Sequence, residues 1–326
     1  KHTNTNTNTN TNMSASTRTK VALITGASSG IGYELTQQLV TKLNYQVYAA
    51  ARRIGPLKEL QAKLGPNKVI PVQLDVCNND SIEELKQQLM EELPERKLDL
   101  LYNNAGQSCT FPALDVSSEN IEDVFRVNVF GPMNLTRELA PFLINAATKG
   151  NVPVIAFTGT LAGTSPFPFA SVYAATKAAV HQYARVLHLE MKPFGVKVLN
   201  VITGGVHTDI ADKRNLPATS IYNFKEGLEA FKYRQEMSKN NHPEEPKDYC
   251  SEIIKDIEAL QNTSKDPVDV YRGTKALFMR IVMMLVPYYF LEMAFMRKFK
   301  LNPAFKAVKE RKKEDAVEEK IEEKEK

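Results

Sequence analysis

Lys20-Val-Ala-Leu-Ile-Thr25, followed by Gly26-Ala-Ser-Ser-Gly30-Ile-Gly32, is the stretch that decides the fold of this chain. The first six residues form a short apolar run of the kind expected in a strand buried on both faces. A glycine-rich turn follows, and a helical pattern then continues to Leu43. At such a junction the free N–H groups and the dipole of the helix N-terminus attract a pyrophosphate. The spacing is G-x-x-x-G-x-G and not G-x-G-x-x-G, so glycines that serve only tight packing are the alternative.

The same alternation of strand and helix continues along the chain. We expect strands at 46–51, 68–74, 98–103, 152–158, 196–202 and 267–271, and helices at 57–64, 81–92, within 119–147 and at 172–191. Asp80, with Glu83 three residues later, predicts the N-cap of the helix at 81–92. Alternation of this kind favours right-handed crossovers and a parallel sheet covered on both faces. The sequence therefore predicts an α/β fold, a Rossmann-type doubly wound parallel sheet, in a single domain over residues 20–273.

The composition excludes several classes of protein. The chain has 326 residues, 43% hydrophobic and 25% charged, and its net charge is only +4, which does not indicate a nucleic-acid binder. Three cysteines, Cys77, Cys109 and Cys250, are too few and too scattered for a disulfide framework or a zinc site. The histidines lack metal-ligand spacing, and His181 and His188 are expected at the surface or at an interface. We predict no metal site.

Tyr173 and Lys177 stand four residues apart in the run 172–191, which lacks glycine and proline. On a helix this spacing places both side chains on one face, in reach of a shared ligand. A phenol titrates near pH ~10, and an ammonium beside it favours the phenolate and lowers that pKa. A lowered pKa suits proton exchange with a carbonyl or an alcohol. Such pairs also arise by chance, so an amphipathic helix with both residues at its surface is the alternative.

The end of the second expected strand indicates which dinucleotide binds. An acidic residue about 20 positions beyond the glycines would hold the ribose 2′-hydroxyl of NAD. Here the sequence reads Ala50-Ala-Arg52-Arg53, without a carboxylate. Two guanidinium groups suit a 2′-phosphate through charge-assisted hydrogen bonds, so NADP(H) is favoured over NAD(H). A solvated basic turn is the alternative interpretation.

The chain resembles the short-chain dehydrogenases/reductases over residues 20–273, because four motifs occur in the order seen in that family: Thr25-Gly-Ala-Ser-Ser-Gly-Ile-Gly32, Asn103-Asn-Ala-Gly106, Asn128 and Tyr173-x-x-x-Lys177. The resemblance implies hydride transfer between a nicotinamide, here NADPH, and an alcohol or ketone. It implies that Tyr173 is the proton donor in the reducing direction. Lys177 would hold the nicotinamide ribose and lower the tyrosine pKa, and Asn128 would support a water that links Lys177 to solvent.

The same resemblance implies further contacts with the cofactor. Asp75 would touch the adenine, Asn104 the adenosine-side ribose region, and Val206 and Thr208 the nicotinamide amide. Ile31 would add a backbone contact. The complete set of predicted cofactor-binding residues is Gly26, Ser28, Gly30, Ile31, Gly32, Arg52, Arg53, Asp75, Asn104, Tyr173, Lys177, Val206 and Thr208.

Two positions depart from the family pattern. Thr160 stands thirteen residues before Tyr173, where the family usually has serine. Threonine keeps the hydroxyl that would bind the substrate carbonyl, although its methyl group restricts χ1. We therefore count Thr160 among the catalytic residues and expect activity with a somewhat altered fit. The second departure is Thr203, in Thr203-Gly-Gly-Val-His-Thr208, where a Pro-Gly pair is common; it loosens the turn without removing Thr208.

Within the family, several stretches resemble the members that reduce acylated dihydroxyacetone phosphate with NADPH in glycerolipid synthesis; they lie at 100–114, 181–185, 188–194, 209–214, 220–224 and 266–273. The resemblance implies a lipid ketone substrate and 1-acylglycerol 3-phosphate as product. A steroid or retinoid ketone reductase would share every catalytic residue and stays open. Residues 210–264 lack a strand pattern and are expected to form a substrate lid. Within this range, Lys213 and Arg214 are candidates to bind a substrate phosphate, and a pair of solvated side chains is the alternative.

A function of another class is also open. Gly26-Ala-Ser28-Ser-Gly30 matches the G-x-S-x-G of a hydrolase nucleophile at a strand–turn–helix junction. A lipid ester hydrolase, such as a triacylglycerol lipase, would also need a histidine and a carboxylate that converge on Ser28, and the sequence cannot place them.

The two ends of the chain differ from its centre. Residues 1–19 are largely a Thr-Asn alternation with nothing to bury, and we expect them to be disordered. Residues 274–303 form a hydrophobic segment whose uninterrupted apolar core, 281–291, has eleven residues and contains Pro287. A spanning helix needs about 18 or more apolar residues, so this core is too short to cross a bilayer simply. The tail 304–326 has eight basic and eight acidic residues and predicts a solvated helix or a disordered tail.

The flanks of the hydrophobic segment favour attachment to a membrane. Basic residues lie on both sides of it, and Tyr288 and Tyr289 lie within it. Basic flanks with interfacial aromatic side chains suit a segment that lies in one leaflet. We expect it at the cytosolic face of the endoplasmic reticulum membrane, at the lipid-droplet surface, or at both. A helix packed on the catalytic domain, or an interface of a homo-oligomer, is the alternative.

Overall fold

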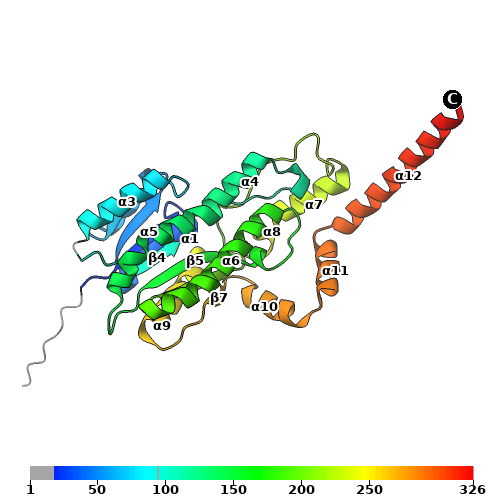
Figure 1. The fold of residues 1–326 in the computed structure, drawn as a ribbon. Coiled ribbons are helices and arrows are strands. Elements are labelled where there is room, and N and C mark those ends of the chain that lie inside the picture. Colours follow the sequence, from blue (N-terminus) through cyan, green and yellow to red (C-terminus); the bar gives the residue numbers. More distant parts are fainter. Residues whose placement is uncertain (1–17, 94, 326) are drawn as a thin grey trace, which may run out of the picture.

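One parallel sheet of seven strands forms the centre of the computed structural model, which describes residues 18–93 and 95–325 (Figure 1). The strand order is β3-β2-β1-β4-β5-β6-β7, and every neighbouring pair is parallel. The strands are β1 (Val21–Thr25), β2 (Gln46–Ala51), β3 (Val69–Gln73), β4 (Leu100–Asn103), β5 (Val154–Thr160), β6 (Lys197–Thr203) and β7 (Asp269–Arg272). The order reverses between β1 and β4, so their carboxyl ends form the switch point where ligands bind in such sheets.

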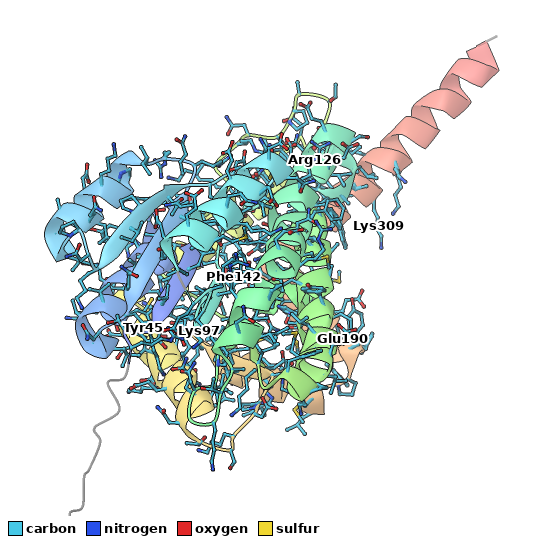
Figure 2. All side chains as sticks on the ribbon, turned by 60° about the vertical axis from the view of Figure 1, so that its left-hand side comes forward. Tyr45, Lys97, Arg126, Phe142, Glu190 and Lys309 are labelled. Atoms are coloured by element: carbon cyan, nitrogen blue, oxygen red, sulfur yellow. The ribbon has the colours of Figure 1, made fainter. Side chains whose placement is uncertain are left out.

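Helices cover both faces of the sheet, which confirms the doubly wound fold expected from the sequence. One face carries α3 (Asn79–Glu92), α5 (Gly131–Ala146) and α6 (Ser171–Met191), and their apolar side chains pack with the sheet in one core cluster. Phe142 of α5 belongs to this layer (Figure 2). The other face carries α1 (Gly30–Leu43), α2 (Gly55–Leu64) and α9 (Pro246–Asn262), which form a second cluster. All five residues of β1 are buried between the layers, as its unbroken apolar run predicts.

Shorter helices complete the domain. They are α4 (Ser118–Phe125), a π-helical turn (Arg126–Phe130), α7 (Lys225–Gln235) and α8 (Met237–Asn240). Three 3₁₀ turns lie at Ala113–Asp115, Leu161–Gly163 and Lys192–Phe194.

Several expected boundaries differ from the structure. The N-cap of α3 is Asn78, whose side chain accepts a hydrogen bond from the Asp80 N–H at 2.8 Å, so Asp80 lies in the first turn. Strand β5 runs two residues further than expected and ends at Thr160. Arg18 forms two hydrogen bonds with the buried carboxylate of Asp99, at 2.7 and 2.9 Å, so the folded domain includes the last residues of the expected leader. The expectation of disorder for residues 1–17 lies outside the described residues.

The C-terminal part of the expected lid belongs to the core. Helix α9 buries Tyr249, Ile253 and Ile257 against the sheet and α1. These apolar side chains recur at helical spacing and form one face of an amphipathic helix. The range 210–264 expected for a lid is therefore too long, and only its first part, up to α9, lies outside the two core layers.

The hydrophobic segment forms two helices, α10 (Ala276–Leu285) and α11 (Tyr288–Lys298), separated at Val286 and Pro287. The residues that the structure describes include no helix long and apolar enough to cross a membrane. Phe299 at the end of α11 is fully buried against the domain, whereas Met284 and Leu285 of α10 are 73% and 76% exposed. The segment therefore packs on the domain with one face and presents large apolar side chains on another.

The charged tail is helical. Helix α12 (Leu301–Glu325) begins against α7 and then projects away from the domain (Figures 1 and 2). Its first turns are fixed by the buried Ala304 and by Arg311, whose guanidinium carbon lies 4.6 Å from the centroid of the Phe224 ring. Of the two expectations for this tail, the structure has the helix.

Candidate active site

The glycine-rich turn occupies the switch point, between β1 and α1. Gly26 and Gly30 have φ of +66° and +56°, which side chains rarely adopt, and a Cβ at Gly32 would lie 2.5 Å from the Gly26 carbonyl oxygen. Gly26 and Gly30 are thus required by backbone conformation and Gly32 by close packing. Ser29, the N-cap of α1, makes no capping hydrogen bond with its side chain. The turn therefore presents a helix N-terminus that its N-cap side chain leaves open, which fits a pyrophosphate.

The predicted 2′-phosphate residues lie at the adjacent strand ends. Arg52 and Arg53 directly follow β2, which pairs with β1, and both side chains are exposed. Within the described ranges neither guanidinium forms an ion pair. Asp75 lies two residues beyond β3, where one of its carboxylate oxygens accepts a hydrogen bond from the Cys77 N–H at 3.0 Å. These positions fit a dinucleotide whose adenosine end carries a phosphate.

Asn104 braces the turn. Its amide nitrogen donates to the carbonyl oxygens of Thr25 and Gly26 at 3.1 and 3.3 Å, and its amide oxygen accepts from the Thr158 hydroxyl at 3.1 Å. This side chain joins the ends of β1, β4 and β5.

The segment that follows β6 approaches the same turn. The Thr208 methyl carbon lies 3.4 Å from the place that a Cβ would take on Gly30. Val206 is buried beside the second core cluster, and Ile31, half-buried, packs against that cluster. The structure thus gathers the predicted contacts for both ends of a dinucleotide along the carboxyl edge of the sheet.

Ser28 lies in the turn without a catalytic triad around it. In the described part of the chain, no hydrogen bond joins its side chain to a histidine or a carboxylate. The hydrolase hypothesis requires both partners, and the geometry of this region gives it no support.

Lys177 is buried on α6, about one helical turn after Tyr173. Its ammonium donates to the Thr158 carbonyl oxygen at 2.9 Å and lies 5.9 Å from the centroid of the Tyr173 ring. Burial lowers the pKa of Lys177 to about 8. The helix therefore brings the two side chains together, as their spacing predicts.

The pKa of Tyr173 corrects an expectation. Burial raises this pKa to about 12, while the positive charge of Arg234 and a hydrogen bond with the Thr160 hydroxyl act in the lowering direction. The net shift of the Tyr173 pKa is therefore opposite to the lowering expected from the sequence. Desolvation of the phenolate outweighs the nearby positive charges, and the opposing influences come from Arg234 and Thr160.

Asn128 lies in the π-helical turn between α4 and α5. Its amide oxygen accepts from the Gln107 N–H at 2.8 Å, and its amide nitrogen donates to the Thr176 hydroxyl at 3.0 Å. Gly106 lies between this side chain and Lys177: a Cβ on Gly106 would be 3.5 Å from the Asn128 amide oxygen and 3.6 Å from the Lys177 ammonium. The two polar groups thus flank one small space, where the predicted water would have hydrogen-bond partners.

Thr160, at the end of β5, is held by a histidine. Its backbone N–H donates to His181 Nε2 at 3.1 Å, and its hydroxyl accepts from the Ala162 N–H at 3.3 Å. His181 and His188 are 1% and 6% exposed, so the expectation of surface positions is wrong. Burial and the charge of Lys177 lower the pKa of His181 to about 4. His181 therefore supports the site as a neutral acceptor.

Aromatic side chains border the substrate side. The ring of Phe169, just before α6, packs edge-on against Tyr222 and Phe231 at centroid distances of 5.1 and 5.8 Å. Arg214, a predicted phosphate contact, is already paired with Asp212, through hydrogen bonds of 3.0 and 2.8 Å.

Residues outside the expected set also belong to this region. They are Thr176, His181 and Arg234. Thr176 and His181 lie on the predicted helix, within four residues of Lys177. This proximity in sequence was the signal that could have identified them. Arg234 comes from the distant helix α7, and its positive charge acts on the Tyr173 phenol.

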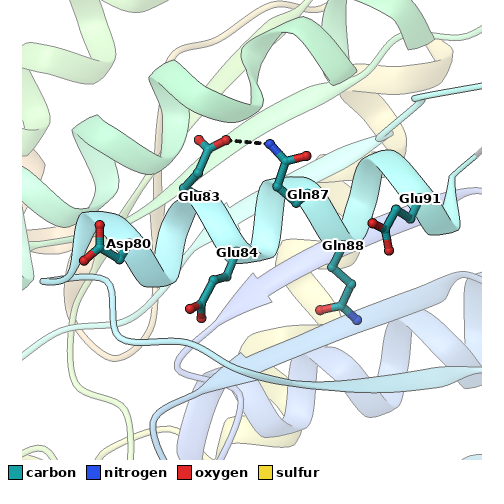
Figure 3. A pocket seen from close by; sticks show the side chains of 6 residues that line it. All are labelled: Asp80, Glu83, Glu84, Gln87, Gln88 and Glu91. Atoms are coloured by element: carbon teal, nitrogen blue, oxygen red, sulfur yellow. Dashed lines mark hydrogen bonds between the residues drawn. The ribbon is translucent and has the colours of Figure 1, made fainter.

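A hollow on the outer side of α3 lies apart from these residues. It is lined by Asp80, Glu83, Glu84, Gln87, Gln88 and Glu91 (Figure 3). The hydrogen bond drawn there joins Gln87 to Glu83 at 2.7 Å. These are side chains of one solvated helix face, and none of the predicted site residues is among them.

Comparison with known proteins gives consistent matches. The family model described as short chain dehydrogenase matches residues 20–218. The chain is 54% identical over 294 residues to the NADPH-dependent 1-acyldihydroxyacetone phosphate reductase of Saccharomyces cerevisiae, covering 90% of this chain and 96% of that protein. It is 33% identical over 234 residues to the protein of the same name from Schizosaccharomyces pombe, covering 69% of this chain and 73% of that protein.

A solved structure supports the fold. The short-chain dehydrogenase from Streptomyces avermitilis matches with a TM-score of 0.70 at 26% identity, over 88% of this chain and 99% of that chain. The match of the family model to more than half of the residues, together with near full-length similarity to the yeast reductase, decides the classification. This chain belongs to the short-chain dehydrogenase family.

Proposed function

We propose that this enzyme reduces the ketone of 1-acyldihydroxyacetone phosphate with NADPH and forms 1-acylglycerol 3-phosphate, a step of glycerolipid and phosphatidate synthesis. The observation that carries the proposal is the 54% identity, over 96% of its length, to a yeast protein named for this reaction. The steroid or retinoid alternative has no comparable support among these relatives.

The residues of the site suit this reaction. Bound NADPH supplies the hydride that the ketone carbon receives. Tyr173 gives its phenolic proton to the ketone oxygen, and the Thr160 hydroxyl holds that oxygen in place. Lys177, fixed by the Thr158 carbonyl, orients the nicotinamide ribose. Asn128 and Lys177 hold a water between them, through which Tyr173 regains its proton from solvent. The carbonyl thus gains one hydride and one proton.

The preference for NADPH rests on Arg52 and Arg53. Both are exposed at the end of β2, and neither is paired with a carboxylate among the described residues. Their guanidinium groups bind the 2′-phosphate, and NADH offers no group to them.

The enzyme acts at a membrane surface. Exposed apolar side chains gather on α10 and α11: Leu277, Phe278, Ile281, Met284, Leu285, Tyr288, Tyr289, Phe290 and Met293. Lys275, Arg297, Lys298 and Lys300 flank them and complement anionic lipid headgroups. An acylated substrate resides in such a surface. We place the protein at the cytosolic face of the endoplasmic reticulum, at lipid droplets, or at both.

A panel of substrates in detergent tests the function. Oxidation of NADPH is followed with 1-acyldihydroxyacetone phosphate, a steroid ketone and a retinal, and release of fatty acid is followed with triacylglycerol. We expect turnover with the first substrate and a kcat/KM at least tenfold lower with the other ketones. Folded protein that binds NADPH but prefers a steroid or retinoid ketone, or that cleaves the ester, would overturn the assignment.

A further inference from the structure

Arg234 is a half-buried cation without an ion-pair partner among the described residues. It lies in the last turn of α7, and its guanidinium carbon is 5.8 Å from the centroid of the Phe167 ring. Among the described residues its buried Nε has no hydrogen-bond partner, and no carboxylate forms an ion pair with it. Because buried donors are normally paired, this guanidinium can bind an acceptor that the described residues do not supply.

Arg214, in the same region, differs because its guanidinium has hydrogen-bond partners in the protein. Asp212 binds it through both carboxylate oxygens, and Asn120 accepts a third hydrogen bond from it at 3.0 Å. The neighbouring Lys213 is exposed. Of these three cations, Arg234 is thus the one with a buried donor that has no partner within the described ranges.

Aromatic side chains lie around the Arg234 guanidinium. Phe167 packs against Phe295 and Phe299 of the C-terminal segment, at centroid distances of 5.5 and 6.0 Å. The positive charge of Arg234 acts on the Tyr173 phenol in the direction that lowers its pKa. In this apolar setting a charge is weakly screened.

We propose that Arg234 binds the phosphate of the substrate and thereby positions the ketone at Tyr173. This inference rests on the proposed function, because the ligand is the phosphate of an acylated dihydroxyacetone phosphate. One methylene group and one ester oxygen separate that phosphate from the ketone carbon, so a substrate held by Tyr173 brings its dianion near. A guanidinium fork meets phosphate oxygens with paired hydrogen bonds.

The test compares two ketones that differ only in the phosphate: 1-acyldihydroxyacetone phosphate and 1-acyldihydroxyacetone. In Arg234→Met we expect kcat/KM to fall about 10- to 100-fold for the phosphorylated ketone, as for lost hydrogen bonds to a charged group. For the phosphate-free ketone we expect a change below about threefold. Arg234→Lys keeps a charge without the fork and should lie between the two. Lys232→Met, an exposed cation of the same helix, is the control and should behave as wild type.

A binding measurement tests, without turnover, whether Arg234 binds the phosphate. The complex with NADP⁺ is titrated with 1-acylglycerol 3-phosphate and with the matching monoacylglycerol. Wild type should bind the phosphorylated lipid at least tenfold more tightly, and Arg234→Met should lose that preference. A preference that persists in the variant, or an equal loss of kcat/KM for both ketones, would overturn the proposal and leave Arg234 acting through the Tyr173 pKa. If wild type reduces neither ketone, the proposed function fails, while the titration still decides the role of Arg234.

Discussion

At the scale of the residue, burial and charge oppose each other around the predicted proton donor. Burial raises the pKa of Tyr173 to about 12 and lowers that of Lys177 to about 8. Both shifts favour the neutral form of each group. The free enzyme therefore holds a protonated phenol at neutral pH, which is the form needed to donate a proton to a ketone.

Gly106 offers a test of the predicted water at this scale. Gly106→Ala adds a methyl group 3.5 Å from the Asn128 amide oxygen and 3.6 Å from the Lys177 ammonium, so it fills their shared space without removing either group. We expect kcat to fall about tenfold or more, with the free energy of unfolding changed by less than ~1 kcal/mol. Gly55→Ala, where a Cβ meets nothing within 4 Å, is the control. Unchanged kcat in Gly106→Ala would show that this space carries no water needed for proton transfer.

His181 predicts a dependence of stability on pH. Its pKa is about 4 in the folded protein and ~6.5 when unfolded, so folding favours the neutral ring. The stability that it contributes is complete above pH ~6.5 and is lost as the pH falls through about 4, with a total of about 3 kcal/mol. Urea unfolding of wild type and His181→Gln between pH 7 and 4 should show a shallower loss in the variant. Parallel curves would contradict the buried neutral histidine.

At the scale of the element, regular patterns were predictable and tertiary contacts were not. The apolar run of β1 and the glycine turn predicted the fold, because a strand buried on both faces needs such a run. Helix α9 was misassigned to a lid, since its polar residues outnumber the apolar face formed by Ile253 and Ile257. The roles of His181 and Arg234 depend on segments that are distant in sequence. Motif spacing located Tyr173 and Lys177, but it could not give the burial that sets their pKa values.

The packing of the C-terminal segment is tested at Phe299, which is fully buried where α11 ends. Phe299→Ala removes the contacts with Phe167 and Tyr233, and we expect a loss of about 3–5 kcal/mol in the stability of this segment. Amide hydrogen exchange within 276–300 measures that loss. Phe290→Ala, at a position that is 57% exposed, should change exchange little. Equal protection in both variants would mean that the segment does not depend on its docking.

At the scale of the whole molecule, a catalytic domain carries an apolar and basic face on one C-terminal segment. Met284→Glu combined with Leu285→Glu places two charges on this face. We expect about a tenfold or greater loss of binding to vesicles that contain anionic phosphatidylserine, measured by flotation, because charges oppose burial in the headgroup region. Leu114→Glu, at a residue 80% exposed outside α10 and α11, is the control. Binding that survives in the double variant would contradict attachment through this face.

Helix α6 carries the proposed proton donor for ketone reduction, and Tyr173→Phe removes the hydroxyl that would supply the proton. The measurement is single-turnover oxidation of NADPH with 1-acyldihydroxyacetone phosphate, alongside fluorescence titration of NADPH binding. We expect the variant to bind NADPH within about threefold of wild type and to reduce the ketone at least ~100-fold more slowly. Reduction at the wild-type rate in Tyr173→Phe would show that the proton comes from another group.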